Sequence, residues 1–215
     1  MSRSLADRGA LGGEQHGEGA VSRPTAHLLI DMVNPFDFPG AEQLFPRALA
    51  VARHIAALKE RLHAAGIPTV YVNDNFGRWE LGFRDLIEHV RANYSAPARL
   101  LELIAPGADD HFILKPKHSA FYATSLEVLL AQWDTRRLIL TGVASNICVM
   151  FTAHDAHMRG FELAVPADCV AAEDDATDAW SLQQMRRVMR ADIRPSPQLL
   201  EGDALSSPAG RVVSA

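Results

Sequence analysis

The sequence predicts a three-layer α/β fold, in which a six-stranded parallel β-sheet lies between two layers of helices. Short apolar runs alternate with stretches whose apolar residues recur every three or four positions, which is typical of alternating strands and helices. The chain has 215 residues, 48% of them apolar, which suits one domain with a substantial core. Several apolar runs end in a polar residue, as expected where parallel strands lead into a ligand site.

Apolar spacing places the elements of the first half of the chain. Between Pro46 and Gly66, apolar residues recur at spacings of four, three and four, which describes one face of a helix. Proline is tolerated in the first turn, and glycine commonly ends a helix. The same reasoning predicts strands at residues 26–30, 69–72 and 112–114, and helices at residues 85–92 and after Pro97.

The second half continues the alternation. A helix is expected from Asn146 to Arg159, ended by Gly160. The other expected elements are helices at residues 126–133 and 180–189, strands at residues 137–140 and 162–165, and a short sixth strand near Ile193. No internal repeat interrupts this order.

Three segments are expected along the chain. Residues 1–24 are rich in Gly, Ser and charge and lack the apolar stretch of a signal peptide, which predicts a flexible arm. This arm is either a disordered extension or one that wraps around another subunit. Residues 25–195 form the folded domain, and residues 196–215 are expected to be an irregular C-terminal tail.

Charge and composition exclude several classes of partner. The formal net charge is −5, whereas nucleic-acid-binding proteins usually present a basic surface. No apolar run approaches the roughly 20 residues that cross a bilayer, and no glycine-rich phosphate-binding loop is present. Two cysteines exclude a disulfide framework. We therefore expect a cytoplasmic protein that acts on a small molecule and contacts neither nucleic acid nor membrane, and the charge is compatible with small neutral or cationic partners.

The strand ends give a short set of candidate functional residues. Ligands of parallel sheets bind beyond the carboxyl ends of the strands. Those ends carry Asp31, Asn73 with Asn75, Lys115, and the turn that leads to Cys148. An acid, a base and a thiol would thus meet at one edge of the sheet.

Cys148 follows a predicted strand and lies just inside a predicted helix. The helix dipole stabilises negative charge there, so the sequence predicts a lowered thiol pKa and a ready nucleophile. The alternative is a small buried hydrophobic residue. Cys169 has no comparable partners and is expected in the core.

Asp31 and Lys115 each admit two interpretations. A carboxylate near a thiol can take its proton and return it later, whereas Asp31 could instead cap a turn. A lysine in a cleft would hold Asp31 and Cys148 in charged forms, whereas Lys115 could instead be solvated.

A substrate pocket is predicted around the same edge. Aromatic and amide side chains are expected to line it, unless the loop after the second strand is a lid or subunit contact. The histidines at 154 and 157 are expected to have a surface or packing role rather than to hold a metal, and the acidic run 173–175 is expected to be solvated in a loop or at a helix start. The pocket residues are Phe36, Asn73, Asn75, Trp79 and Phe121.

Three segments together resemble the isochorismatase-like cysteine hydrolases. Residues 28–36 (LLIDMVNPF), 114–121 (LKPKHSAF) and 142–149 (GVASNICV) are similar to the three motifs of that family, in the same order. Thr152-Ala153 and Asp155-Ala156 extend the third motif. The resemblance covers about residues 25–195.

The resemblance implies a catalytic triad of Asp31, Lys115 and Cys148 on a six-stranded parallel sheet. It implies a cis peptide between Val143 and Ala144, and an oxyanion hole made by the backbone N–H groups of Ala144 and Cys148. It further implies a homo-oligomer, either a dimer or a tetramer.

Departures from the family pattern bear on cofactor and substrate. The nicotinamidases of the family hold a metal with an Asp-x-His pair and a later His, and the region after Asp31 offers only Asp37 and His54. We therefore expect no catalytic metal and no cofactor. Val33 replaces a common Gln, and His118 replaces a common Tyr, so the substrate is left open.

Three hypotheses follow. The first is a metal-independent hydrolase that cleaves a C–N bond of a small amide, ureido or carbamoyl compound through a Cys148 acyl intermediate. The second is a vinyl-ether hydrolase of the isochorismatase type, in which Asp31 is the acid and Cys148 is dispensable. The third is a binding protein without catalytic activity.

Overall fold

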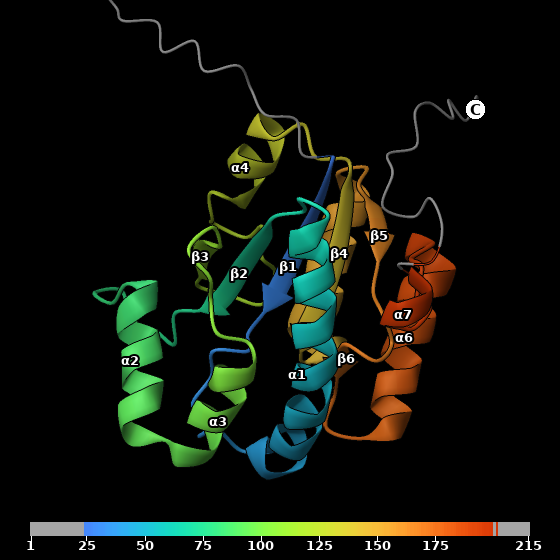
Figure 1. Ribbon diagram of the computed structural model, residues 1–215. Helices are drawn as coiled ribbons and strands as arrows, with labels where there is room; N and C mark the ends of the chain where they lie inside the picture. The colour runs from blue at the N-terminus through green and yellow to red at the C-terminus, as the bar shows by residue number, and fades with distance from the viewer. Residues whose placement is uncertain (1–23, 200, 202–215) are drawn as a thin grey trace, which may run out of the picture.

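The computed structural model describes residues 24–199 and residue 201, and shows a parallel sheet with helices on both faces (Figure 1). The strand order is β3-β2-β1-β4-β5, and β6 pairs with β4 beyond the end of β5. The strands are β1 (Thr25–Ile30), β2 (Thr69–Asp74), β3 (His111–Lys115), β4 (Arg137–Val143), β5 (Glu162–Ala164) and β6 (Val170–Ala171).

The helices connect these strands. Helix α1 (Ala41–Ala64) is the longest, and Gly66, at a φ of 73°, lies just beyond its end. A π-helical turn, η1 (Ser145–Val149), leads directly into α5. The remaining helices are α2 (Phe83–Asn93), α3 (Ser95–Leu103), α4 (Leu126–Gln132), α5 (Met150–Met158), α6 (Asp175–Met189) and α7 (Ser196–Leu199).

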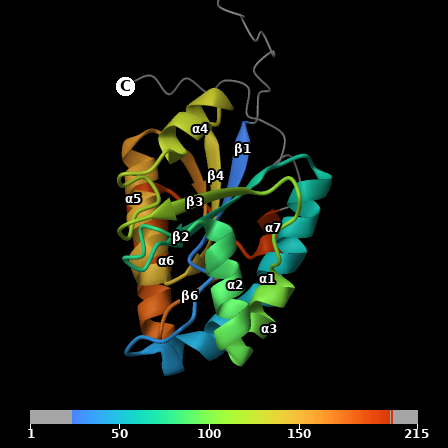
Figure 2. The same ribbon diagram turned by 90° about the vertical axis from the view of Figure 1, so that its left-hand side faces the viewer.

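The core has two halves because side chains alternate between the faces of each strand. On β1, Leu29 faces the layer formed by α1, α2, α3 and α7, while Leu28 and Ile30 face the layer formed by α4, α5 and α6. Figure 2 shows α5 and α6 on one side of the sheet and α1, α3 and α7 on the other. All six residues of β1 are buried, as expected for a central parallel strand.

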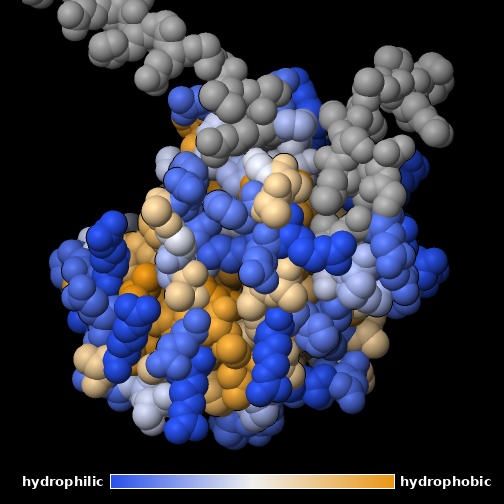
Figure 3. Space-filling view, viewed as in Figure 1, coloured by the Kyte–Doolittle hydropathy of each residue, from blue (hydrophilic) through white to orange (hydrophobic). Residues whose placement is uncertain are grey.

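The outer surface is mostly polar on the face viewed in Figure 3, and apolar residues gather between α1 and α2. Leu103, the last residue of α3, is 40% exposed. Within the described part of the chain, no helix has the length and hydrophobicity required of a membrane span.

The sixth strand and the C-terminal segment differ from the sequence expectations. The sixth strand is Val170–Ala171, whereas the segment near Ile193 makes only one parallel bridge, between Ala164 and Asp192. The expected irregular tail begins with helix α7 instead, because Leu199 is buried against the core. The expectations for residues 1–23 and 202–215 lie outside the described residues.

Candidate active site

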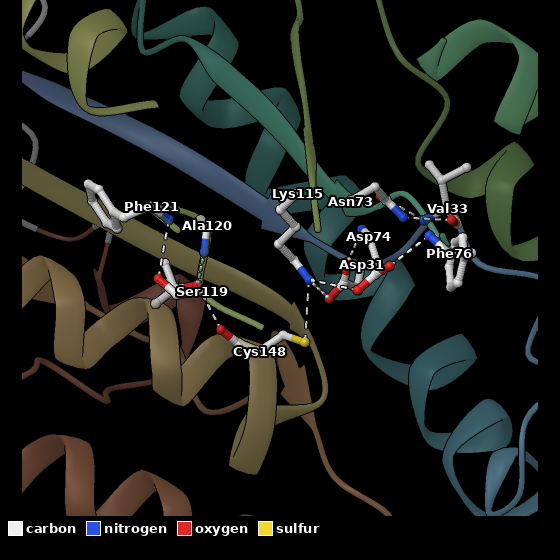
Figure 4. Close-up of polar contacts among 11 residues, drawn as sticks. Asp31, Val33, Asn73, Asp74, Phe76, Lys115, Ser119, Ala120, Phe121 and Cys148 are labelled. Atoms are coloured by element: carbon white, nitrogen blue, oxygen red, sulfur yellow. Dashed lines mark hydrogen bonds and ion pairs between the residues drawn. The ribbon is translucent and has the colours of Figure 1, made fainter. Parts of the chain in front are cut away.

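The carboxyl ends of β1, β3 and β4 bring Asp31, Lys115 and Cys148 into contact. The Lys115 ammonium nitrogen lies 2.8 Å from Oδ2 of Asp31 and 3.5 Å from Sγ of Cys148. Figure 4 shows the ammonium group between the carboxylate and the sulfur. The predicted acid, lysine and thiol therefore lie in one cluster.

The backbone around Asp31 is shaped by close contact between β1 and β4. Asp31 has a φ of 52°, an uncommon left-handed conformation that aspartate tolerates better than most residues. Gly142 has a φ of 112°, and a Cβ there would overlap the carbonyl oxygen of Ile30. Glycine at 142 therefore lets β4 approach β1 directly beside Asp31.

Cys148 is held in the π-helical turn that follows β4. The N–H of Val149 donates to the carbonyl of Ala144 at 3.2 Å, which defines the wide turn. The peptide bond between Val143 and Ala144 is cis. Among the described residues, the N–H of Ala144 donates no backbone hydrogen bond. This donor and the first-turn N–H of Cys148 are thus the groups near the sulfur that could meet an oxyanion.

Burial dominates the protonation equilibria of the cluster. It raises the pKa of the Cys148 thiol, Asp31 adds to this effect, and Lys115 opposes it. Burial also raises the pKa of Asp31, although Lys115 opposes this. Burial alone would lower the pKa of Lys115, but the neighbouring acidic groups raise it. The lowered thiol pKa expected from the helix terminus is therefore wrong, because burial and the adjacent carboxylate outweigh the helix dipole and Lys115.

Positioning contacts hold the cluster from both sides. The Asn73 side chain accepts from the N–H of Val33 at 3.3 Å and donates to its carbonyl at 2.6 Å (Figure 4). Thr152 donates to the carbonyl of Cys148 at 2.7 Å and accepts from the N–H of Ala120 at 3.0 Å. These bonds fix the loop after Asp31 and the turn that carries the thiol.

A cavity of about 320 Å³ opens beside the thiol. Asp31, Cys148 and Ala144 line it, so the candidate nucleophile, the candidate acid and the candidate oxyanion donor face the same space. The other lining residues are Asn34, Phe38, Leu44, Asp74, Phe76, His118, Val143, Ile147 and Glu173.

The five residues predicted to line the pocket are not among those that line this cavity. Asn73 is fully buried and bonded to Val33, and Asn75 accepts from the N–H of Gly77 within its own turn. Phe36 packs edge-on against Phe45, in the layer that contains α1.

The two remaining aromatics do not line the cavity, for different reasons. Phe121 is buried in the layer that contains α4, α5 and α6, where its ring contacts Phe161. Trp79 is 76% exposed, and Phe76, earlier in the same loop, lines the cavity instead.

The sequence predicts no individual role for three polar groups of the site, although Asp74 lies in the loop expected to line the pocket. Oδ2 of Asp74 lies 3.8 Å from the Lys115 ammonium nitrogen. The backbone N–H of Asp74 donates to Oδ1 of Asp31 at 2.6 Å. His118 was noted only as a departure from a motif, and Glu173 only as part of an acidic run. The available signal was position, since Asp74 ends β2 and Glu173 follows β6 at the same edge of the sheet.

Metal ligands are not gathered at this site. Within residues 24–199, no group of three or more His, Cys, Asp or Glu side chains has an arrangement that could hold a metal ion. His154 bonds instead to the carbonyl of Met150, one turn earlier in its own helix.

Comparison with known proteins identifies the family. Residues 25–193 match the isochorismatase domain. The chain belongs to the isochorismatase family. Members of this family are hydrolases, and amidases occur among the relatives of this chain.

Three similar proteins illustrate the relationship. The uncharacterized isochorismatase family protein YaaI of Bacillus subtilis is 38% identical, over 82% of this isochorismatase-family chain and 96% of its own length. Maleamate amidohydrolase of Pseudomonas putida is 29% identical, over 69% of this chain and 72% of its own. The crystal structure of N-carbamoylsarcosine amidase from Thermoplasma acidophilum superposes with a TM-score of 0.64 at 27% identity, covering 83% of this chain and 99% of that one.

Proposed function

We propose that this protein hydrolyses a C–N bond of a small amide, ureido or carbamoyl compound through a covalent Cys148 intermediate, without a catalytic metal. The observation that carries the proposal is the position of Lys115, whose ammonium touches both the Asp31 carboxylate and the Cys148 sulfur beside a cavity. The amidases among its relatives support the reaction class.

The first half of the reaction uses Asp31 as base and then as acid. The thiol has a raised pKa, so it gives its proton to Asp31 as the sulfur attacks the substrate carbonyl carbon. The N–H groups of Ala144 and Cys148 stabilise the oxyanion that forms. Asp31 then passes the proton to the leaving nitrogen, the C–N bond breaks, and an amine or ammonia departs.

The second half releases the acyl group. Asp31, ionised again, takes a proton from a water molecule whose oxygen attacks the thioester carbon. The C–S bond breaks, the sulfur regains a proton from Asp31, and the acid product leaves. Lys115 keeps Asp31 anionic between these steps by its charge and its hydrogen bond.

The test is a panel of small amides, ureas and carbamates assayed with the wild type and with Cys148→Ala. We expect turnover by the wild type and a loss of at least about a thousandfold in the variant, as when other covalent nucleophiles are removed. Turnover that survives the substitution would overturn the proposal.

A second assay distinguishes vinyl-ether hydrolysis from amide hydrolysis. Isochorismate is supplied to both proteins, and pyruvate is measured. Release of pyruvate at equal rates by the wild type and Cys148→Ala would favour acid catalysis by Asp31 alone. Absence of turnover with every compound, together with an unreactive Cys148, would favour a binding role.

A further inference from the structure

The cavity beside Cys148 has an acidic wall. Asp31, Asp74 and Glu173 line it, and no Lys or Arg is among the described residues that do. Lys115 is fully buried behind this wall, where it contacts Asp31 at 2.8 Å and Asp74 at 3.8 Å. Of the three carboxylates, Lys115 thus contacts those of Asp31 and Asp74 but not that of Glu173.

Glu173 is the carboxylate without a partner. It follows β6 and precedes α6, is partly buried, and within the described part of the chain makes no hydrogen bond or ion pair. Asp31 has Lys115, and Asp74 accepts from the N–H of Phe76 at 2.7 Å. Glu173 is therefore free to pair with a group that enters the cavity.

The rest of the cavity is largely apolar. Its volume of about 320 Å³ lies at the small end of the range of ligand pockets, so it suits a compact molecule. A substrate with its carbonyl group at Cys148 would place its remaining atoms against these apolar side chains. Those atoms would then lie within the electrostatic field of the Glu173 carboxylate. The apolar lining residues are Phe38, Leu44, Phe76, Val143, Ala144 and Ile147.

We infer that this site selects small amides that carry a positive charge, with Glu173 as the counter-ion of the cationic group, and that it discriminates against amides that carry a carboxylate. The inference deepens the proposed function and rests on it for the reaction. The preference for cations at Cys148 is a separate property, because it depends on the charges of the wall.

Charged thiol reagents test this preference without requiring turnover. The 2-aminoethyl, methyl and 2-sulfonatoethyl methanethiosulfonates carry positive, zero and negative charge. Each forms a mixed disulfide with a thiolate and releases methanesulfinate. Rates at Cys148 are followed by peptide mass, which separates it from the buried Cys169, at low salt because salt screens the effect. Each rate is divided by the rate with a free small thiol.

The wild type should favour the cationic over the anionic reagent by about tenfold, a modest value for a site lined by one sign of charge. Glu173→Gln should reduce this ratio severalfold, and the neutral reagent reports whether Cys148 stays accessible. Glu162→Gln makes the same chemical change at the start of β5, the opposite end of the sheet, and should leave the ratio unchanged. Equal ratios in the wild type and Glu173→Gln would overturn the inference.

Substrates of matched size complete the test. We expect kcat/KM to fall in the order 4-aminobutanamide, pentanamide and succinamate, and Glu173→Gln to lower the first value relative to the second. A preference for succinamate would also overturn the inference. Charge selection by the reagents without turnover of any amide would count against the proposed function alone.

Discussion

The ammonium nitrogen of Lys115 lies 2.8 Å from a carboxylate oxygen of Asp31, and the lysine side chain has no exposed surface. Lys115 is the last residue of β3 and Asp31 directly follows β1, with β2 between the two strands in the sheet. A buried charge without a partner is strongly unfavourable, so each residue holds the other in its charged form. In the proposed reaction, this pair keeps Asp31 available as a base beside a thiol that is itself protonated.

Replacing Lys115 by Met should leave the buried Asp31 carboxylate uncompensated. We expect the free energy of unfolding to fall by about 3–5 kcal/mol, which urea denaturation measures. The double variant Asp31→Asn, Lys115→Met removes both charges and should recover most of that loss while remaining inactive. A double variant less stable than Lys115→Met would contradict the ion-pair account.

The pH dependence of kcat/KM should report Asp31. Burial raises its pKa above the usual carboxyl value of about 3.9. A protonated Asp31 cannot accept the thiol proton, so activity should be lost as the pH falls through this raised pKa. Lys115 opposes the shift, so any residual activity of Lys115→Met should be lost at a higher pH than in the wild type. An acid limb at or below the usual carboxyl value would count against Asp31 as the base.

The pH dependence of Cys148 alkylation by iodoacetamide should respond to a substitution at Asp31. Asp31 contributes to the raised pKa of the thiol, whereas Lys115 lowers it. Asp31→Asn should therefore move the alkylation profile to lower pH by about one unit, even though catalysis is lost. Cys148→Ala measures the background from Cys169. An unchanged or upward-shifted profile would mean that the two side chains do not interact as described.

Gly142 should tolerate no side chain. An alanine Cβ there would overlap the carbonyl oxygen of Ile30, so we expect Gly142→Ala to destabilise the fold by about 3 kcal/mol or more. Gly66→Ala is the matched control, because it also has a positive φ but has no atom within 4 Å of the added carbon. It should cost about 1 kcal/mol. If Gly142→Ala and Gly66→Ala lowered the melting temperature equally, the steric explanation would be contradicted.

The positions of Asp31, Lys115 and Cys148 were predictable because they lie where apolar runs stop. Asp31 directly follows the buried strand β1, Lys115 is the last residue of β3, and a parallel sheet brings such ends to one edge. Cys148 was identified from the strand-to-turn-to-helix pattern and from the family motif. Its protonation state was not predictable, because that depends on burial and on the distance to Asp31.

The pocket was harder to predict because neighbouring strand residues face opposite ways. Asn73 and Asp74 are adjacent in the sequence, yet Asn73 bonds to the loop at Val33 while Asp74 reaches toward Lys115. Phe36 and Phe38 both pack against the core, but only Phe38 also lines the cavity. The spacing of residues in the sequence does not reveal these side-chain directions, because the conformation of the turn sets them.

The most direct test of the central claim is the mass of the peptide that contains Cys148, measured after rapid quenching during turnover of an amide. We predict that Cys148 gains the mass of the acyl group, that hydroxylamine removes this mass, and that it disappears once substrate is exhausted. Full turnover with Cys148 unmodified at every time point would contradict the account.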